Sequence, residues 1–355
     1  MTSRRKPEEA PPPAAPAPAP RRRSNSVTVN DVARVAGVSA MTVSRAVNVP
    51  ERLPPATLAR VQAAIAQTGY VPNLLAGGLR SNRSRLVAAL VPTLDSPVFA
   101  ELVQGLTAAL HARGYQLMLG QTGYTESHED ELLRAVIGRR PDGILLTGVR
   151  HSPQARQRLA AAGIPVVETW DLTDQPIDML VGFSHPAVGE AVCRYLHGRG
   201  RRRLAVIGGN DERSRRRSDA FCATARALGL APPVVQEVPA PTTLGSGRAA
   251  LLALRRADAA VDGIFCSSDL LALGVLTEAM VQGVRIPEQL AVVGFGDLAF
   301  ARDLHPALTT VRIDGTRIGE EAARCLVDRA EGRTAPADGA PVVDTGFSIV
   351  ERASA

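Results

Sequence analysis

The sequence predicts an α/β protein in which a small helical head precedes a doubly wound body large enough for two lobes. Residues 28–70 read as short helices with few strand-forming residues. From Leu86 onward, apolar runs of strand length alternate with amphipathic helical stretches, a pattern typical of parallel sheets covered by helices. The length of 355 residues also exceeds one ordinary domain and suits two or three.

The positive charge of the chain is concentrated near its N-terminus. Residues 1–85 contain 13 Lys and Arg residues against 4 Asp and Glu residues, whereas the rest of the chain contains 28 against 31. The first quarter therefore supplies all of the net charge of +6, which indicates a nucleic-acid-binding head on a near-neutral body. Aromatic residues make up 3% of the chain, which argues against a stacking surface for single-stranded nucleic acid.

Composition excludes several classes of protein and site. No apolar run reaches the ~18 residues needed to span a bilayer, and the N-terminus lacks the apolar core of a secretory signal. The four cysteines lie far apart and form no Cys-x-x-Cys pair, so neither a zinc site nor a disulfide framework is expected. We therefore expect a cytoplasmic protein without membrane contact, metal or cofactor.

The first 24 residues form a compositionally distinct arm. They are mainly Arg, Pro and Ala, which cannot bury a core, so we expect residues 1–24 to be disordered. The run Arg21–Arg23 either contacts DNA phosphates or belongs to a solvated tail, and the sequence leaves both interpretations open.

The segment after the arm has the pattern of a helix-turn-helix motif. Thr28 and Asp31 form a capping box that starts a first helix, and Gly37 allows a tight turn after it. Ser39 caps a second helix over 40–48. Such a second helix enters the major groove with its N-terminus first. The alternative is an ordinary helical hairpin with no role in DNA binding.

Arg45 is the best candidate for reading a base in this second helix. Its guanidinium can bind O6 and N7 of guanine together, which is worth about 1–3 kcal/mol of discrimination against other bases. Ser39, Thr42 and Ser44 are better suited to phosphate contacts, which set the position of a protein on DNA without reading its sequence.

The body contains six apolar runs that read as buried parallel strands. These runs are residues 86–92, 142–147, 164–168, 203–209, 262–268 and 290–295. Glycines follow several of the intervening helices, where a helix C-cap needs a positive φ. They are Gly114, Gly163, Gly200, Gly229 and Gly283. Together, the runs and the caps indicate alternating strands and helices.

Two segments resemble a known family closely. DVARVAGVSAMTVSRAVN at 31–48 and GYVPNLLAGGL at 69–79 resemble the head and hinge of the lactose-repressor (LacI/GalR) family, and the order of the body matches as well. In that family the second helix reads half-site bases. A hinge helix then begins at the Tyr-x-Pro-Asn stretch, and a leucine late in it inserts into the minor groove and kinks the DNA.

The resemblance implies a DNA-binding surface on this chain. The predicted DNA-binding residues are Thr28, Ser39, Ala40, Met41, Thr42, Ser44, Arg45, Asn48, Tyr70, Asn73 and Leu79. It also implies a bacterial, nucleoid-associated homodimer that binds double-stranded operator DNA with a pseudo-palindromic sequence. The chain shows no leucine heptads after Ile349 that would form a tetramer bundle.

The body resembles periplasmic sugar-binding proteins, as the body of that family does. The expected organisation is an arm at 1–24, a helix-turn-helix domain at 25–72, a hinge helix and linker at 73–84, and a ligand-binding and dimerisation body at 85–355. We expect a first lobe at about 85–181 and 312–332, and a second lobe at about 182–311 and 342–350.

A small-molecule effector of such a body is expected between the lobes, at the carboxyl ends of the strands. Most candidates follow predicted strands, and the family resemblance adds an arginine and an aspartate that commonly hold the hydroxyls of a sugar. The predicted effector-binding residues are Asp95, Phe99, Arg150, His151, Trp170, Arg217 and Asp269. The alternatives are that Asp269 caps the helix after it, that Trp170 is a core residue and that Arg150 is a solvated loop residue.

The cleft residues favour an anionic effector. Many family members carry a sugar-binding carboxylate where this chain has Gly296, whereas Arg150, His151 and Arg217 offer positive charge. The segments VFAELVQGL, RGYQLMLGQTGY, DGILLT, AGIPVVE and LVGF resemble the gluconate-operon repressors of the family. We therefore expect gluconate or a related sugar acid, with or without a phosphate, and the alternative is a neutral sugar or another small metabolite.

The sequence disfavours two other classes of function. An enzyme is disfavoured because the chain has no Gly-x-Gly-x-x-Gly or Walker-type motif and no Ser/His/Asp set with recognisable spacing, so no catalytic residue is assigned. A periplasmic-type sugar-binding protein would share the body but would need a signal peptide and would have no use for residues 28–80.

Overall fold

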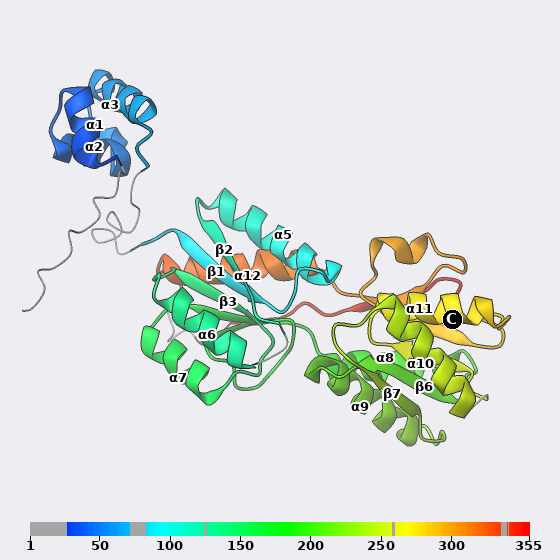
Figure 1. The fold of residues 1–355 in the computed structure, drawn as a ribbon. Coiled ribbons are helices and arrows are strands. Elements are labelled where there is room, and N and C mark those ends of the chain that lie inside the picture. The colour runs from blue at the N-terminus through cyan, green and yellow to red at the C-terminus, as the bar shows by residue number, and fades with distance from the viewer. Residues whose placement is uncertain (1–26, 72–82, 124–125, 258–259, 335–338, 340) are drawn as a thin grey trace, which may run out of the picture. The chain divides into compact units, whose positions relative to one another are not determined.

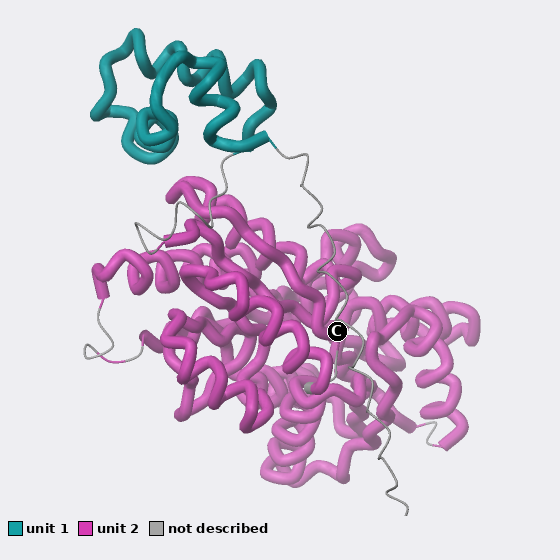
Figure 2. The backbone as a smooth tube through the Cα atoms, turned by 60° about the vertical axis from the view of Figure 1, so that its left-hand side comes forward, with its two compact units in different colours: residues 1–82 teal, residues 83–355 magenta. Residues whose placement is uncertain are grey.

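The computed structural model describes residues 27–71, 83–123, 126–257, 260–334, 339 and 341–355. The chain divides into two compact units, residues 1–82 and residues 83–355, which we call the head and the body (Figure 2). The expected arm at 1–24 and most of the expected hinge, with Asn73 and Leu79, lie outside the described residues.

The described part of the head is helical. Its elements are α1 (Val29–Ala36), α2 (Ala40–Asn48), the 3-10 helix η1 (Pro50–Arg52) and α3 (Pro55–Thr68). A small apolar core holds the three α-helices together, and it consists of Val32, Ala33, Ala36, Val43, Val61 and Ala64. Val43 is the one buried residue of α2. The other side chains of this helix are at least partly accessible and can contact a partner.

The local signals of the helix-turn-helix motif are confirmed. The Asp31 carboxylate accepts hydrogen bonds from the backbone N–H and the hydroxyl of Thr28, at 2.9 and 2.7 Å. Gly37 ends α1 with a φ of 67°, in the left-handed region that favours glycine. The Ser39 hydroxyl accepts a 3.1 Å hydrogen bond from the backbone N–H of Thr42 and so caps α2.

The body contains two six-stranded sheets, one in each lobe (Figure 1). The first sheet has the order β11-β5-β4-β3-β1-β2, with β1 (Leu86–Val91), β2 (Gln116–Gln121), β3 (Gly143–Thr147), β4 (Val166–Thr169), β5 (Met179–Gly182) and β11 (Val342–Asp344). The second has the order β12-β10-β9-β8-β6-β7, with β6 (Leu204–Gly209), β7 (Val234–Val238), β8 (Gly263–Cys266), β9 (Ala291–Phe295), β10 (Thr309–Arg312) and β12 (Ser348–Val350). Neighbouring strands are parallel except β10 and β12, which are antiparallel.

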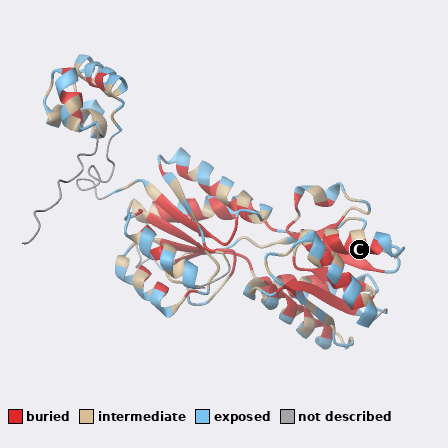
Figure 3. Ribbon diagram, viewed as in Figure 1, coloured by how far each residue is buried: buried red, intermediate tan, exposed pale blue. Residues whose placement is uncertain are grey.

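Helices cover both faces of each sheet, as expected for a doubly wound fold. The first lobe carries α5 (Pro97–Ala112), α6 (Glu126–Ile137), α7 (Pro153–Ala162) and α12 (Gly315–Ala330). The second carries α8 (His185–Gly198), α9 (Glu212–Ala227), α10 (Leu244–Ala257), α11 (Asp269–Val281) and the short η2 (Ala299–Arg302). Buried residues are concentrated on the strands and on the helix faces that pack against them (Figure 3).

All six predicted strand runs contain a strand, and all five predicted glycine caps have a positive φ. The strands β2, β5, β7 and β10 lie outside these six runs, and the last strand expected near 342–350 is two short strands, β11 and β12. One boundary is wrong: residues 342–350 do not belong wholly to the second lobe. Val342–Asp344 form β11, which pairs with β5 of the first sheet, and only Ser348–Val350 form β12 in the second sheet. The last crossing between the lobes therefore lies between these two short strands and not between residues 332 and 342.

Helices α5 and α12 pack closely in the first lobe because glycines remove the side chains at their contact. A Cβ atom on Gly319 would clash with the backbone carbonyl oxygen of Leu102, and one on Gly105 would clash with that of Thr316. Since a backbone cannot move aside as a flexible side chain can, both contacts require glycine.

We predict that Gly319→Ala destabilises the body by about 1–3 kcal/mol, because the added methyl forces α5 and α12 apart. The measurement is the thermal unfolding of the full chain by calorimetry. The matched control is Gly198→Ala at the end of α8, where no atom lies within 4 Å of the added Cβ. Equal midpoints for the two variants would contradict the packing argument.

Candidate functional site

A cavity of about 450 Å³ lies in the body at the carboxyl ends of the strands. In the first lobe its wall takes residues that follow β1 and β4, and in the second lobe residues that follow β6, β7, β8 and β9. This is where a ligand is expected in open α/β sheets, and the volume falls in the range of small-molecule sites.

Four of the predicted effector residues line this cavity: Asp95, Phe99, Trp170 and Arg217. Asp95 is exposed, whereas the other three are buried. The remaining predicted residues, Arg150, His151 and Asp269, are not part of the wall. The structure therefore brings together residues from both lobes but excludes three charged candidates.

Arg217 is held in a fixed position in the cavity wall. Its Nη1 donates a 2.9 Å hydrogen bond to Nδ1 of His185, and its Nη2 donates a 3.3 Å bond to the carbonyl of Ser267. The guanidinium carbon lies 4.1 Å from the centre of the Phe295 ring, a favourable cation–π contact. Burial lowers the pKa of Arg217 to about 10, so the side chain stays positively charged near neutral pH.

His185 connects Arg217 to the first lobe as a neutral imidazole. Burial, together with the positive charge of Arg217, lowers the pKa of His185 well below its ordinary value. Its Nε2 lies 2.9 Å from the carbonyl oxygen of Trp170, so this nitrogen carries the proton and donates it. Nδ1 is then free to accept from Arg217, which fixes the tautomer.

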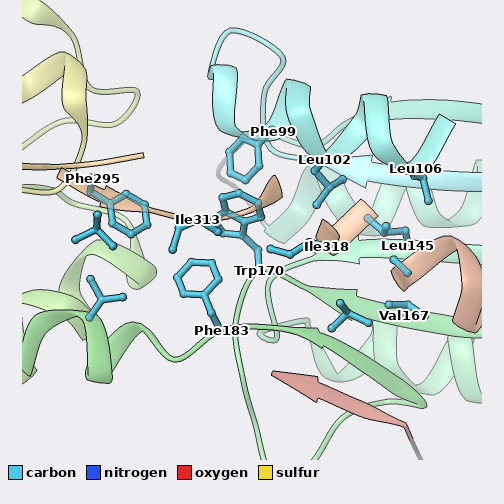
Figure 4. Close-up of a cluster of buried hydrophobic side chains, with 14 of the residues drawn as sticks. Phe99, Leu102, Leu106, Leu145, Val167, Trp170, Phe183, Phe295, Ile313 and Ile318 are labelled. Carbon is cyan, nitrogen blue, oxygen red and sulfur yellow. The ribbon is translucent and has the colours of Figure 1, made fainter. Parts of the chain in front are cut away.

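Four aromatic side chains bridge the lobes beside the cavity, and we call them the aromatic bridge (Figure 4). Phe99 lies 5.2 Å from Trp170, Trp170 lies 5.6 Å from Phe183, and Phe183 lies 6.2 Å from Phe295, measured between ring centres. Trp170 also has a φ of 70°, an unusual conformation for a bulky residue that costs about 1–3 kcal/mol. Trp170 is therefore both a core residue and part of the cavity wall.

His151 does not offer a free charge to a ligand, which corrects the prediction. Its ring is fully buried between two carboxylates, with Nδ1 2.6 Å from Oε1 of Glu129 and Nε2 3.3 Å from Oε1 of Glu168. Burial alone would lower the pKa of His151, but the two carboxylates outweigh it and raise the pKa to about 9. The imidazolium is neutralised inside the first lobe, by residues that the sequence does not place beside it.

Arg150 and Asp171 also have partners, and both partners lie on α9 of the second lobe. Arg150 forms a 3.2 Å ion pair with Glu212, and both side chains are largely exposed. Asp171 is buried and forms a short ion pair with Arg216. These two pairs join the lobes next to the cavity. Arg150 is thus paired and is not part of the cavity wall, and its binding to the effector stays a prediction.

Asp269 is buried inside the second lobe and is not part of the cavity wall, so its predicted contact with the effector stays a prediction. One carboxylate oxygen accepts a 2.6 Å bond from the hydroxyl of Thr310, and the other accepts a 2.7 Å bond from the backbone N–H of Leu298. Burial raises the pKa of Asp269 to about 6. It is not the helix cap either, because Ser268 occupies that position and accepts a hydrogen bond from the N–H of Leu271.

Arg213 is not among the predicted effector residues, yet it lines the cavity four residues before Arg217. Residues at this spacing lie on one face of a helix, so the run of arginines at the start of α9 contained the signal. The wall also includes Asp211, the N-cap of α9, and the hydroxyl residues Ser267 and Thr242. These residues follow β6, β7 and β8. They lie close together only because these strands are neighbours in the second sheet.

The head presents several predicted DNA-binding residues at its surface. Met41 and Arg45 are exposed one turn apart on α2, with the Met41 sulfur 4.0 Å from Nη2 of Arg45. Asn48 donates a 2.8 Å hydrogen bond to the carbonyl of Ser44. Thr28 and Ser39 are exposed as well, Thr42 and Ser44 are half-buried, and Ala40 and Tyr70 pack against the apolar core of the head.

Comparison with known proteins agrees with both parts of this description. Residues 28–73 match the family model for bacterial regulatory proteins of the lacI family, and residues 193–355 match a periplasmic binding protein-like domain. The HTH-type transcriptional regulator GntR of Pseudomonas aeruginosa is 36% identical over 335 residues, covering 94% of this chain and 97% of that protein.

The chain belongs to the lacI family of bacterial regulatory proteins. It is a LacI-type transcriptional repressor and not an enzyme, and the relatives named GntR support a place in the gluconate-repressor subgroup. Members of the family bind operator DNA and small-molecule effectors and act as dimers.

Solved structures support the same assignment. A LacI-family regulator from Silicibacter pomeroyi has a TM-score of 0.87 and 33% identity, covering 92% of this repressor and 99% of that chain. The lac repressor dimer bound to operator has a TM-score of 0.81 at 22% identity, covering 93% and 99%, which shows the same fold. In the part of the repressor that the structure describes, no helix is both long and apolar enough to cross a membrane.

We predict that His151 makes the stability of the repressor depend on pH above neutrality. Because the folded-state pKa is raised from 6.5 to about 9, the contribution of the imidazolium is complete below about pH 6.5 and is lost as the pH rises through 9. A pKa shift of this size corresponds to at most about 3 kcal/mol of unfolding free energy.

His151→Gln should therefore lower stability near pH 6.5 and flatten the decline between pH 6.5 and about 9.5, measured as the thermal midpoint at each pH. The control is His111→Gln on the exposed side of α5, which should follow the unmodified protein. Parallel curves for the His151 variant and the unmodified protein would contradict the assignment.

Proposed function

We propose that this repressor is a homodimer that binds a pseudo-palindromic operator in the bacterial cytoplasm, on the nucleoid, and responds to gluconate or a related sugar acid. The observation that carries the effector part is the cavity wall, where Arg213 and Arg217 project from one face of α9 among hydroxyl-bearing residues. Arginine is suited to a carboxylate because its planar guanidinium donates two parallel hydrogen bonds.

Two of the three positively charged residues that favour an anionic effector in the sequence are paired with carboxylates in the structure. His151 is neutralised by Glu129 and Glu168, and Arg150 is paired with Glu212. Arg213 replaces them as a positive group at the cavity. The likeness to regulators named GntR and the resemblance to gluconate-operon repressors support the same class of ligand.

The DNA-binding proposal rests on the exposed surface of α2. Met41 and Arg45 are available for base contacts, while Thr28, Ser39, Thr42, Ser44 and Asn48 surround them with groups suited to phosphates. Ala40, Tyr70, Asn73 and Leu79 complete the proposed surface by family resemblance. Binding of the operator and binding of the effector are coupled because each favours a different arrangement of the two lobes.

We predict that Arg45→Ala weakens binding to the operator by about 1–3 kcal/mol, with little effect on binding to unrelated DNA. The measurement is a gel shift of the full chain with DNA from upstream of its own operon, in parallel with a scrambled duplex. The control is Arg60→Ala, an exposed arginine on α3 outside the proposed reading helix. An unchanged specific shift for Arg45→Ala would contradict the assignment of α2.

We predict that gluconate releases the repressor from its operator and lowers the affinity about 5- to 150-fold, the usual range of allosteric coupling. The measurement is the same gel shift, titrated with gluconate, related sugar acids and neutral sugars. Release by neutral sugars alone would contradict a sugar-acid effector and would leave the DNA-binding proposal intact.

A further inference from the structure

The two arginines of the cavity wall differ in how much of their hydrogen-bonding capacity is free. Arg217 already donates to His185 and to the Ser267 carbonyl, and one face of its guanidinium is covered by Phe295. Only its Nε lacks a hydrogen-bond partner among the described residues. A buried guanidinium used in this way cannot turn to form two parallel bonds with a ligand without breaking those contacts.

Arg213 has its donors available. Its guanidinium carbon lies 5.4 Å from the centre of the Phe99 ring, and its Nε lies 3.9 Å from Oδ1 of Asp211, beyond hydrogen-bond distance. Within the described parts of the chain, no hydrogen bond involves its guanidinium. The side chain is nevertheless largely shielded from solvent, with 14% exposed, so a charge-assisted bond formed there is stronger than one at an open surface.

The remaining polar groups of the wall can form hydrogen bonds with the hydroxyl groups of a ligand. The Ser267 hydroxyl oxygen already accepts from the N–H of Gly209, so its O–H is left to donate. Ser268 and Thr242 share a 2.9 Å hydrogen bond in which either oxygen can be the donor. Asp95 is exposed at the wall, and in the described structure its carboxylate accepts no hydrogen bond from the protein.

The formal charges of the wall cancel. Asp95 and Asp211 balance Arg213 and Arg217 among the residues that line the cavity. A ligand with one anionic group can use the free donors of Arg213, whereas a second anionic group would meet carboxylates or the occupied Arg217. A neutral polyol would leave the Arg213 donors without a charged partner.

We propose that Arg213 binds the carboxylate of the effector, that Arg217 serves as a fixed positioning residue, and that the effector is a polyhydroxylated molecule with a single negative charge. This inference rests on the proposed sugar-acid function and narrows it. It favours a free sugar acid over dicarboxylates and phosphorylated sugar acids.

The test compares three six-carbon probes that differ in charge: gluconate with one carboxylate, sorbitol with none and glucarate with two. Binding to the full-length dimer is measured by calorimetry and by the fluorescence of Trp170, the only tryptophan of the chain, which lines the cavity. The unmodified repressor should bind gluconate at least about tenfold more tightly than either of the other probes.

Arg213→Ala should weaken gluconate binding about 10- to 100-fold and should leave sorbitol binding nearly unchanged, so that the preference for the charged probe disappears. Arg213→Lys keeps the charge but not the planar fork, and it should recover part of the lost affinity. The matched control is Arg215→Ala on the same helix, whose exposed side chain pairs with Glu237 and does not line the cavity; it should bind gluconate normally.

Three results would overturn the inference, and they are distinguishable. Gluconate binding within about twofold of normal in Arg213→Ala would show that another group, such as Arg217, binds the carboxylate. Equal binding of glucarate and gluconate by the unmodified repressor would refute the single-charge requirement. If the unmodified repressor shifts its operator but binds neither sugar acid, the sugar-acid function itself fails and the inference fails with it.

Discussion

The aromatic bridge of Phe99, Trp170, Phe183 and Phe295 is the contact on which the body depends. It draws side chains from both lobes into one continuous apolar core (Figure 4). Large rings bury more apolar area than other side chains and prefer offset or edge-to-face contacts, so they fix the distance between the lobes. Three of the four rings, those of Phe99, Trp170 and Phe295, also line the cavity, so the contact that joins the lobes and the cavity wall share residues.

The first turns of helix α9 contribute both to the cavity wall and to the contact between the lobes. Glu212 and Arg216 form ion pairs with the first lobe, while Arg213 and Arg217 line the cavity. All four residues sit on one rigid element, so a ligand that shifts the arginines acts directly on the ion pairs. Such an arrangement gives a physical basis for linkage, which requires that the ligand interact differently with two arrangements of the lobes.

The residues around the cavity carry less net positive charge than the sequence indicates. A histidine and an arginine at strand ends suggest an accumulation of positive charge, yet His151 lies between two glutamates and Arg150 is paired across the cleft. What remains is a balanced wall with one arginine whose donors are free. The proposed selectivity for an anion rests on these free donors, because the formal charges of the wall cancel.

The sequence by itself determined the features that short-range interactions decide. The capping box of Thr28 and Asp31, the glycine turn at Gly37 and the six apolar strands depend on neighbours a few residues apart, and the structure confirms them. The family resemblance and the edge of the sheets where a ligand is expected follow from the same local signals. Only the tertiary structure decided which charged side chains face the cavity. His151 meets Glu129, and Asp269 meets Thr310, through contacts 22 and 41 residues apart in the chain. Such partners depend on sheet order and lobe crossings, which no local pattern specifies.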